Sequence, residues 1–132
     1  MLGELGEVVM RRALITTIVA AGVAVASPGA RAAEAPYAAS MERLSEILGS
    51  LHFLRNLCGE NGTAWRDEMN ELLATENPEP ELRAKLVASF NHGYRSFDAV
   101  YTTCTESAYA AITRYMAEGE KLSREIAVRY GD

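Results

Sequence analysis

Cys58 and Cys104 are the residues of this chain whose types and number point most directly to a chemistry. Two thiols allow one intramolecular disulfide, and closing a loop of about 46 residues stabilises a fold by roughly 4 kcal/mol in the chain-entropy treatment. The alternatives are two free buried thiols or a redox-active pair. Catalytic dithiols usually lie two residues apart, and these cysteines do not. We therefore expect a structural disulfide between Cys58 and Cys104.

The two histidines, His52 and His92, give little support to a metal or haem site. Neither belongs to a Glu-x-x-His pair of the kind that builds a di-metal site in a helical bundle, and no Cys-x-x-Cys-His motif for covalent haem occurs. Haem held without a covalent bond by a Met and a His is the remaining alternative. We expect ordinary, partly buried histidines, no metal ligands and no cofactor.

The sequence contains no recognisable set of catalytic residues for hydrolysis. The serines lie in or at the ends of helical patterns, and no Gly-x-Ser-x-Gly turn occurs. A pair of carboxylates could cleave a polysaccharide, but the acidic residues between 68 and 81 have the pattern of a solvated edge. We expect no catalytic residues. A cell-wall-active enzyme stays as an alternative to a non-enzymatic protein.

Tyrosines are concentrated in the C-terminal half of the chain. Their main expected role is packing in the core and at its edge, with the hydroxyls reaching water. The alternative is an exposed face for a protein partner, because Tyr, Trp and Arg contribute much of the binding energy of protein interfaces. The residues predicted for such a partner surface are Tyr94, Arg95, Tyr109 and Arg114.

The first 32 residues have the three parts of a secretory signal peptide. Arg11-Arg12 precedes the uncharged run from Ala13 to Ala26, and the small residues around Arg31 suit a cleavage site. We expect a leader over residues 1–32, with Met10 as an alternative start, and one domain over residues 33–132. The apolar run is shorter than the roughly 20 residues of a membrane-spanning helix. We therefore predict a periplasmic protein without stable membrane insertion after cleavage; an uncleaved N-terminal anchor is the alternative.

Size and charge limit the possible partners of the domain that would remain after removal of the leader. About 100 residues suit one domain with one core. The whole chain has a net charge of −5 at pH 7, and losing the leader would make it more acidic. Nucleic acids and anionic membrane surfaces attract Lys and Arg. We therefore expect no nucleic-acid binding, and an envelope protein of unknown identity as the partner.

Apolar residues recur every three or four positions, which predicts an all-α fold, and no segment alternates with the period of a strand. We expect helices over residues 38–57, from an N-cap at Thr63 to before Asn77, over 81–104, and from an N-cap at Thr105 to about Tyr130. The last two could form one helix, but the β-branched residues between 102 and 105 favour a break. The predicted architecture is a small four-helix up-down bundle with one disulfide.

Several segments together resemble a family of small exported proteins of alphaproteobacteria. They are Leu51-His52-Phe53-Leu54-Arg55-Asn56-Leu57-Cys58, Trp65-Arg66, Phe90-Asn91-His92-Gly93-Tyr94-Arg95 and Tyr101 to Cys104. The similarity covers nearly the whole chain after the leader. The family carries only a domain-of-unknown-function label, so the resemblance implies a cell-envelope protein with a cysteine at each of these two places and supplies no catalytic residue.

Overall fold

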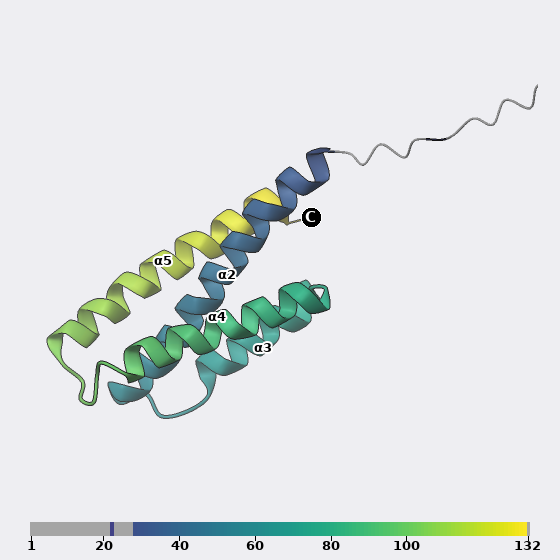
Figure 1. Ribbon diagram of the computed structural model, residues 1–132. Coiled ribbons are helices and arrows are strands. Elements are labelled where there is room, and N and C mark those ends of the chain that lie inside the picture. Colours follow the sequence, from purple (N-terminus) through teal and green to yellow (C-terminus); the bar gives the residue numbers. More distant parts are fainter. Residues whose placement is uncertain (1–21, 23–27, 132) are drawn as a thin grey trace, which may run out of the picture.

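The computed structural model describes Gly22 and residues 28–131. Within residues 28–131, side chains are described from residue 36 onward. Four helices follow one another in this part of the chain: α2 (Pro28–Leu57), α3 (Ala64–Glu76), α4 (Pro80–Asp98) and α5 (Glu106–Tyr130) (Figure 1). They contain no strand between them, which confirms the predicted all-α bundle. None of these helices combines the length and apolarity that a membrane crossing needs. Most of the predicted leader, residues 1–21 and 23–27, lies outside the described residues.

Two helix boundaries differ from those predicted. Helix α2 begins at Pro28 instead of residue 38, because the alanine-rich sequence around Pro36 favours helix strongly enough to include a proline that lacks an N–H donor. Helix α4 ends at Asp98 instead of Cys104, since the β-branched residues between 100 and 105 lose rotamer freedom in a helix. The predicted break before the last helix is therefore confirmed, and it begins earlier than expected.

The two predicted threonine caps have different outcomes. Thr105 caps α5, because its hydroxyl accepts a hydrogen bond of 3.2 Å from the backbone N–H of Ala108. Thr63 precedes α3 but makes no such bond with the backbone; its hydroxyl donates instead to the Asp67 carboxylate at 3.0 Å. Only the first prediction is confirmed.

Helix α2 lies at the centre of the fold. Each of the other three helices packs against it, and they pack far less against one another. Figure 1 shows α5 along one side of α2, with α3 and α4 on the other. From residue 41 to residue 57 every residue of α2 is buried or partly buried. The core therefore surrounds one helix, in two clusters that contain Met41, Leu44, Leu48, Met69, Leu73, Leu86, Phe90 and Ile126, and Ile47, Leu51, Leu54, Ala108, Ala111 and Ile112.

Two glycines allow α2 and α4 to touch through their backbones. A Cβ atom built on Gly49 would lie 1.9 Å from the carbonyl oxygen of Phe90, and one on Gly93 would lie 2.1 Å from that of Glu46. Contacts this short do not occur between real atoms, so any side chain at either position would separate the helices. Ser45 and Ser50 are also buried in α2, and each hydroxyl donates to the carbonyl four residues earlier. Small side chains thus make this crossing possible.

The predicted disulfide is confirmed. Cys58 and Cys104 are bonded, with Cα atoms 4.9 Å apart. Cys58 follows the last residue of α2, and Cys104 lies in the connection between α4 and α5. Contrary to expectation, Cys104 does not lie at the end of a helix over residues 81–104, because the non-helical connection after Asp98 brings it to Cys58. The bond fixes the ends of α2 and α5 to each other, and so helps to define the space beside α5.

An ion pair also holds α5 on α2. Arg43 donates two hydrogen bonds of 2.8 Å to the Glu118 carboxylate, and its guanidinium lies 5.5 Å from the centre of the Tyr115 ring. These hydrogen bonds keep the pKa of Glu118 below its usual value. Two parallel bonds from one guanidinium fix the relative orientation of the two helices.

We expect Glu118→Gln to lower the free energy of unfolding by about 0.5–1 kcal/mol, because the pair is about two-fifths exposed and water screens it. Urea denaturation measures this change. The control is Glu125→Gln, which removes an exposed pair with Lys121 at 3.9 Å and should change stability by less than about 0.5 kcal/mol. Equal effects of the two substitutions would show that the Arg43 pair adds nothing.

Candidate functional site

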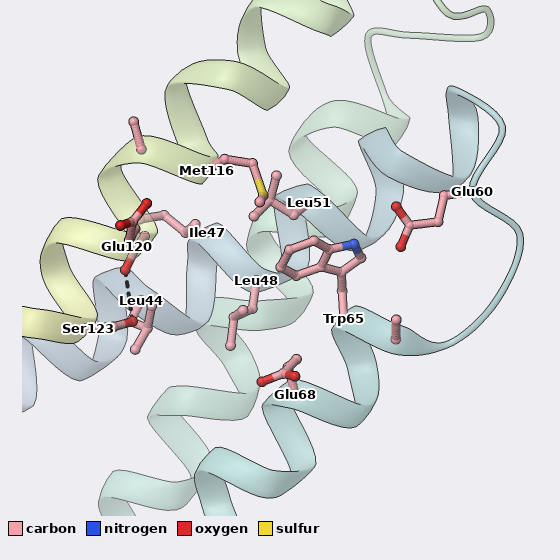
Figure 2. A pocket seen from close by; sticks show the side chains of 13 residues that line it. Leu44, Ile47, Leu48, Leu51, Glu60, Trp65, Glu68, Met116, Glu120 and Ser123 are labelled. Atoms are coloured by element: carbon pink, nitrogen blue, oxygen red, sulfur yellow. Dashed lines mark hydrogen bonds between the residues drawn. The ribbon is translucent and has the colours of Figure 1, made fainter.

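A pocket of about 570 Å³ lies between α3 and α5, over α2. Figure 2 shows Trp65 of α3 and Met116 of α5 on either side of Leu51 of α2, with Leu48 of α2 beside Trp65. Met116 is 39% exposed and Trp65 is half-buried. The pocket thus has an apolar floor from the central helix and walls from two helices that flank it.

Two smaller pockets extend this space in both directions. One of about 230 Å³ is lined by Glu71, Leu72 and Thr75 and shares Leu44 and Leu48 with the large pocket. At the disulfide end, another of about 230 Å³ shares Glu60 with the large pocket. Its other lining residues are Arg55, Cys58, Tyr109 and Ile112. We refer to the three pockets together as the α3–α5 groove.

The spacing of residues in α3 and α5 explains why each helix presents one edge to the groove. Residues three or four apart in a helix are neighbours on one face. Such stripes consist of Tyr109, Ile112, Met116, Glu120 and Ser123 on α5 and of Trp65, Glu68, Leu72 and Thr75 on α3. Along the α3 stripe, from Trp65 to Thr75, the groove is roughly 15 Å long, at 1.5 Å per residue. It is therefore elongated and follows the bundle axis.

The groove has an acidic rim. Its carboxylates are Glu60, Glu68, Glu71 and Glu120. Arg55 is the basic side chain among the described lining residues, and it forms an ion pair with Glu60. Glu120 pairs with Arg124 at 2.7 Å, whereas no ion pair of Glu68 or Glu71 is found in the described part of the chain. Unpaired negative charge is thus concentrated on the α3 side.

Trp65 is the tryptophan of this chain and forms one wall of the groove. The Arg55 guanidinium lies 5.9 Å from the centre of its ring. The indole nitrogen is buried without a hydrogen-bond partner, on the side of the ring nearest Glu60 (Figure 2). An unsatisfied buried donor costs about 1–3 kcal/mol. A rearrangement that supplies a hydrogen-bond acceptor to the indole nitrogen would therefore be favourable.

The histidines lie away from the groove. His52 is only 8% exposed and its ring lies 5.9 Å from that of Phe90 and 5.5 Å from that of Tyr94, whereas His92 is exposed. Burial lowers the pKa of His52, and the positive charge of Arg66 lowers it further. In the part of the chain that the structure describes, no three His, Cys, Asp or Glu side chains are grouped as metal ligands would be.

Because His52 is neutral in its buried position, the protein is expected to lose stability as the pH falls. Below a pH of about 6.5 the unfolded chain takes up a proton at this histidine, while the folded protein does so only at lower pH. Stability should therefore decline below pH 6.5, by up to about 1.4 kcal/mol per pH unit for one proton. Urea denaturation between pH 5 and 8 should show a smaller slope for His52→Asn than for the wild type. Equal slopes in the two proteins would contradict the assignment.

The four residues predicted to form a partner surface do not share one face. Tyr94 is half-buried with its ring 5.4 Å from that of Phe53, and Arg95 is exposed beside it on α4. On α5, Tyr109 and Arg114 are separated by five residues, which places them about 140° apart around the helix. Tyr109 is 57% exposed at the disulfide end of the groove, and Arg114 lies against the Tyr115 ring at 5.4 Å. Of the four, only Tyr109 therefore borders the groove.

Sequence reasoning missed most of the groove residues, among them Trp65, Glu68, Met116 and Glu120. The signal for them was present in the three- and four-residue spacing of apolar and acidic side chains on α3 and α5. Ser123 also lies there, but its hydroxyl donates to the carbonyl of Gly119 at 2.8 Å, the bond drawn in Figure 2. The groove thus combines an apolar floor with charged side chains at its edge.

Comparison with known proteins places the chain in a family. No curated protein and no solved structure is significantly similar to it. A family model described as "Protein of unknown function (DUF2385)" matches residues 36–130, which include both cysteines and every residue of the groove. The expected resemblance to a family without an assigned function is thereby confirmed, while its range among bacteria and its export stay predictions. The chain belongs to the DUF2385 family of proteins of unknown function.

Proposed function

We propose that this protein is an exported, non-enzymatic interaction module of the cell envelope that holds a segment of a partner protein in its α3–α5 groove. The observation that carries the proposal is the elongated groove itself, with an apolar floor and partly exposed Trp65 and Met116 at its walls. Large aromatic side chains and methionine are over-represented where proteins bind one another. From residue 41 to residue 57 the central helix is otherwise buried or partly buried by the protein's own helices.

Export is supported by two independent features. The leader-like sequence of residues 1–32 would direct secretion, and a disulfide persists in oxidising compartments such as the periplasm. The Cys58–Cys104 bond closes one end of the groove. A periplasmic location would therefore keep the groove in the form described.

A small ligand such as haem gains less support as the occupant. Such ligands are bound in compact pockets that enclose most of their surface, whereas this groove runs along the helices. Neither His52 nor His92 is among its lining residues. A partner's polypeptide segment fits an elongated groove better.

Site-specific crosslinking tests the proposal in the native envelope. A photo-reactive amino acid at Met116 or Ser123 would lie in the groove, and one at Arg95 or Val128 would lie on other exposed surfaces. Each is combined with Ala117→Phe, which fills the groove, or with Ala110→Phe, a matched change at an exposed alanine of α5 outside it. Mass spectrometry of the crosslinked peptides identifies the partner segment.

We expect Met116 and Ser123 to crosslink to the same segment of one partner, with loss of the product in Ala117→Phe and retention in Ala110→Phe. Crosslinks from Arg95 that persist in Ala117→Phe would place the partner on the Tyr94 and Arg95 side of the bundle and refute the groove. The absence of a specific product from all four positions would refute the interaction module.

A further inference from the structure

We infer that the segment held in the α3–α5 groove is a basic amphipathic helix; this inference rests on the proposed function and specifies its partner. The groove combines an apolar floor with carboxylates at its edges. An amphipathic helix presents an apolar stripe with charged residues on either side of it. The two patterns are complementary when the charges on the incoming helix are positive.

The arrangement of the helices favours a helical occupant. Helices α3 and α5 both pack on α2 but make little or no contact with each other. In a four-helix bundle each helix lies against two neighbours across a shared core. A helix from a partner that lies between α3 and α5 would contact both, and its apolar stripe would cover Leu44, Leu48 and Leu72. Amphipathic helices that lie in apolar grooves are a recurrent mode of recognition.

The charges at the rim of the groove indicate that the partner helix is positively charged. Glu60 and Glu120 are engaged with arginines of this chain. Glu68 and Glu71 lie three residues apart on the α3 edge, with no ion pair to either in the described residues. Lys or Arg residues along one side of the incoming helix would meet these two carboxylates. They are therefore the groups whose removal should weaken binding.

The same charges disfavour the other occupants. A second copy of this chain would bring a net charge of −5 to a rim that is already negative. The phosphate of an anionic lipid would meet the same repulsion. At physiological ionic strength such effects act over roughly 8 Å, so they act on an occupant that lies directly against the rim.

Peptide binding to the purified protein tests the inference, and Trp65 in the groove wall reports it through its fluorescence. The probe is a peptide of about 14 residues, near the minimum length for helix formation in water. It has leucines at positions i, i+3, i+4 and i+7 and lysines at most other positions. A second peptide replaces every lysine with glutamate, and a third replaces every lysine with glutamine. Vesicles of phosphatidylglycerol serve as the lipid probe.

The protein variants are Glu68→Gln combined with Glu71→Gln, and the control Glu81→Gln combined with Asp98→Asn. The control removes the same charge from exposed positions of α4 outside the groove. We expect the lysine peptide to bind the wild type and the control equally. We expect about three- to tenfold weaker binding to the groove variant, since each exposed ion pair contributes up to about fivefold. Ala117→Phe should abolish binding, and Ala110→Phe should not.

The possible failures are distinguishable. If the glutamine or glutamate peptide binds as well as the lysine peptide, and Ala117→Phe blocks it, the groove binds helices but the basic partner is wrong. If lysine-peptide binding is equal in the groove variant and its control, the assigned carboxylates are wrong. If no peptide binds while the crosslinking experiment still finds a partner segment in the groove, the inference fails and the proposed function stands. Vesicle binding that Ala117→Phe blocks would assign the groove to lipid and overturn both.

Discussion

Replacing Gly93 with alanine is expected to lower the free energy of unfolding by about 2–3 kcal/mol. The added Cβ would lie 2.1 Å from the carbonyl oxygen of Glu46 and 2.8 Å from the Ser50 hydroxyl. The carbonyl oxygen of Glu46 belongs to the backbone of α2 and cannot shift by itself. The clash is therefore relieved only if α4 moves away from the central helix. Alanine gains about 1 kcal/mol of helix propensity over glycine, which offsets part of the loss. Thermal and urea denaturation followed by circular dichroism measure the difference.

Gly119→Ala is the matched control for this prediction. A Cβ atom there would lie 3.2 Å from the Ile47 Cγ2 methyl group, which belongs to a side chain and can shift by a few tenths of an ångström. The helix-propensity gain is the same, so the change in stability should stay within about 1 kcal/mol. Gly49→Ala, with its Cβ 1.9 Å from the Phe90 carbonyl oxygen, should behave like Gly93→Ala. If all three variants were equally stable, the backbone contact between α2 and α4 would be incorrect.

The central position of α2 could not be predicted from its sequence. The apolar stripe through Met41, Leu44 and Leu48 indicates one buried face, and it gives no reason to bury the polar residues between them. Ser45, Ser50 and His52 are nevertheless buried. The serine hydroxyls bond to carbonyls of their own helix, so they can be buried at little cost. Ser50 is also small enough to lie against Gly93 of α4. Periodicity identifies apolar faces, but it does not reveal which polar side chains are satisfied locally.

The groove shows a similar division between local and tertiary information. The helical spacing of Tyr109, Ile112 and Met116 is visible in the sequence, as is that of Trp65 and Glu68. That these two stripes face each other depends on how α3 and α5 are placed around α2, which no local pattern contains. The predicted partner surface joined tyrosines and arginines by residue type alone, and the structure places Arg114 and Tyr109 on different sides of α5. Residue types suggested a partner surface, while the groove for which we propose binding could be located only from the fold.

Removal of the disulfide is expected to have the largest effect on stability of any change considered. The double substitution Cys58→Ser with Cys104→Ser frees a loop of 46 residues that contains α3 and α4. The unfolded chain gains conformational entropy, which corresponds to about 4 kcal/mol. For a domain of roughly 100 residues this lowers the melting temperature by about 15 °C or more. Differential scanning calorimetry of the oxidised wild type and the double variant measures the change.

The wild type in the presence of a reductant provides the control for this prediction. It should melt near the temperature of the double variant, and the variant itself should not respond to the reductant. The native structure gives a second reason to expect a large loss: Cys104 lies in the non-helical connection after Asp98, where the disulfide replaces the helix hydrogen bonds that would otherwise fix the chain. Without the bond, the start of α5 and Tyr109 at the end of the groove are free to move away from Cys58. Peptide binding to the groove should therefore weaken in the double variant even at temperatures where it remains folded, and unchanged melting and binding would show that packing alone holds this end of the bundle.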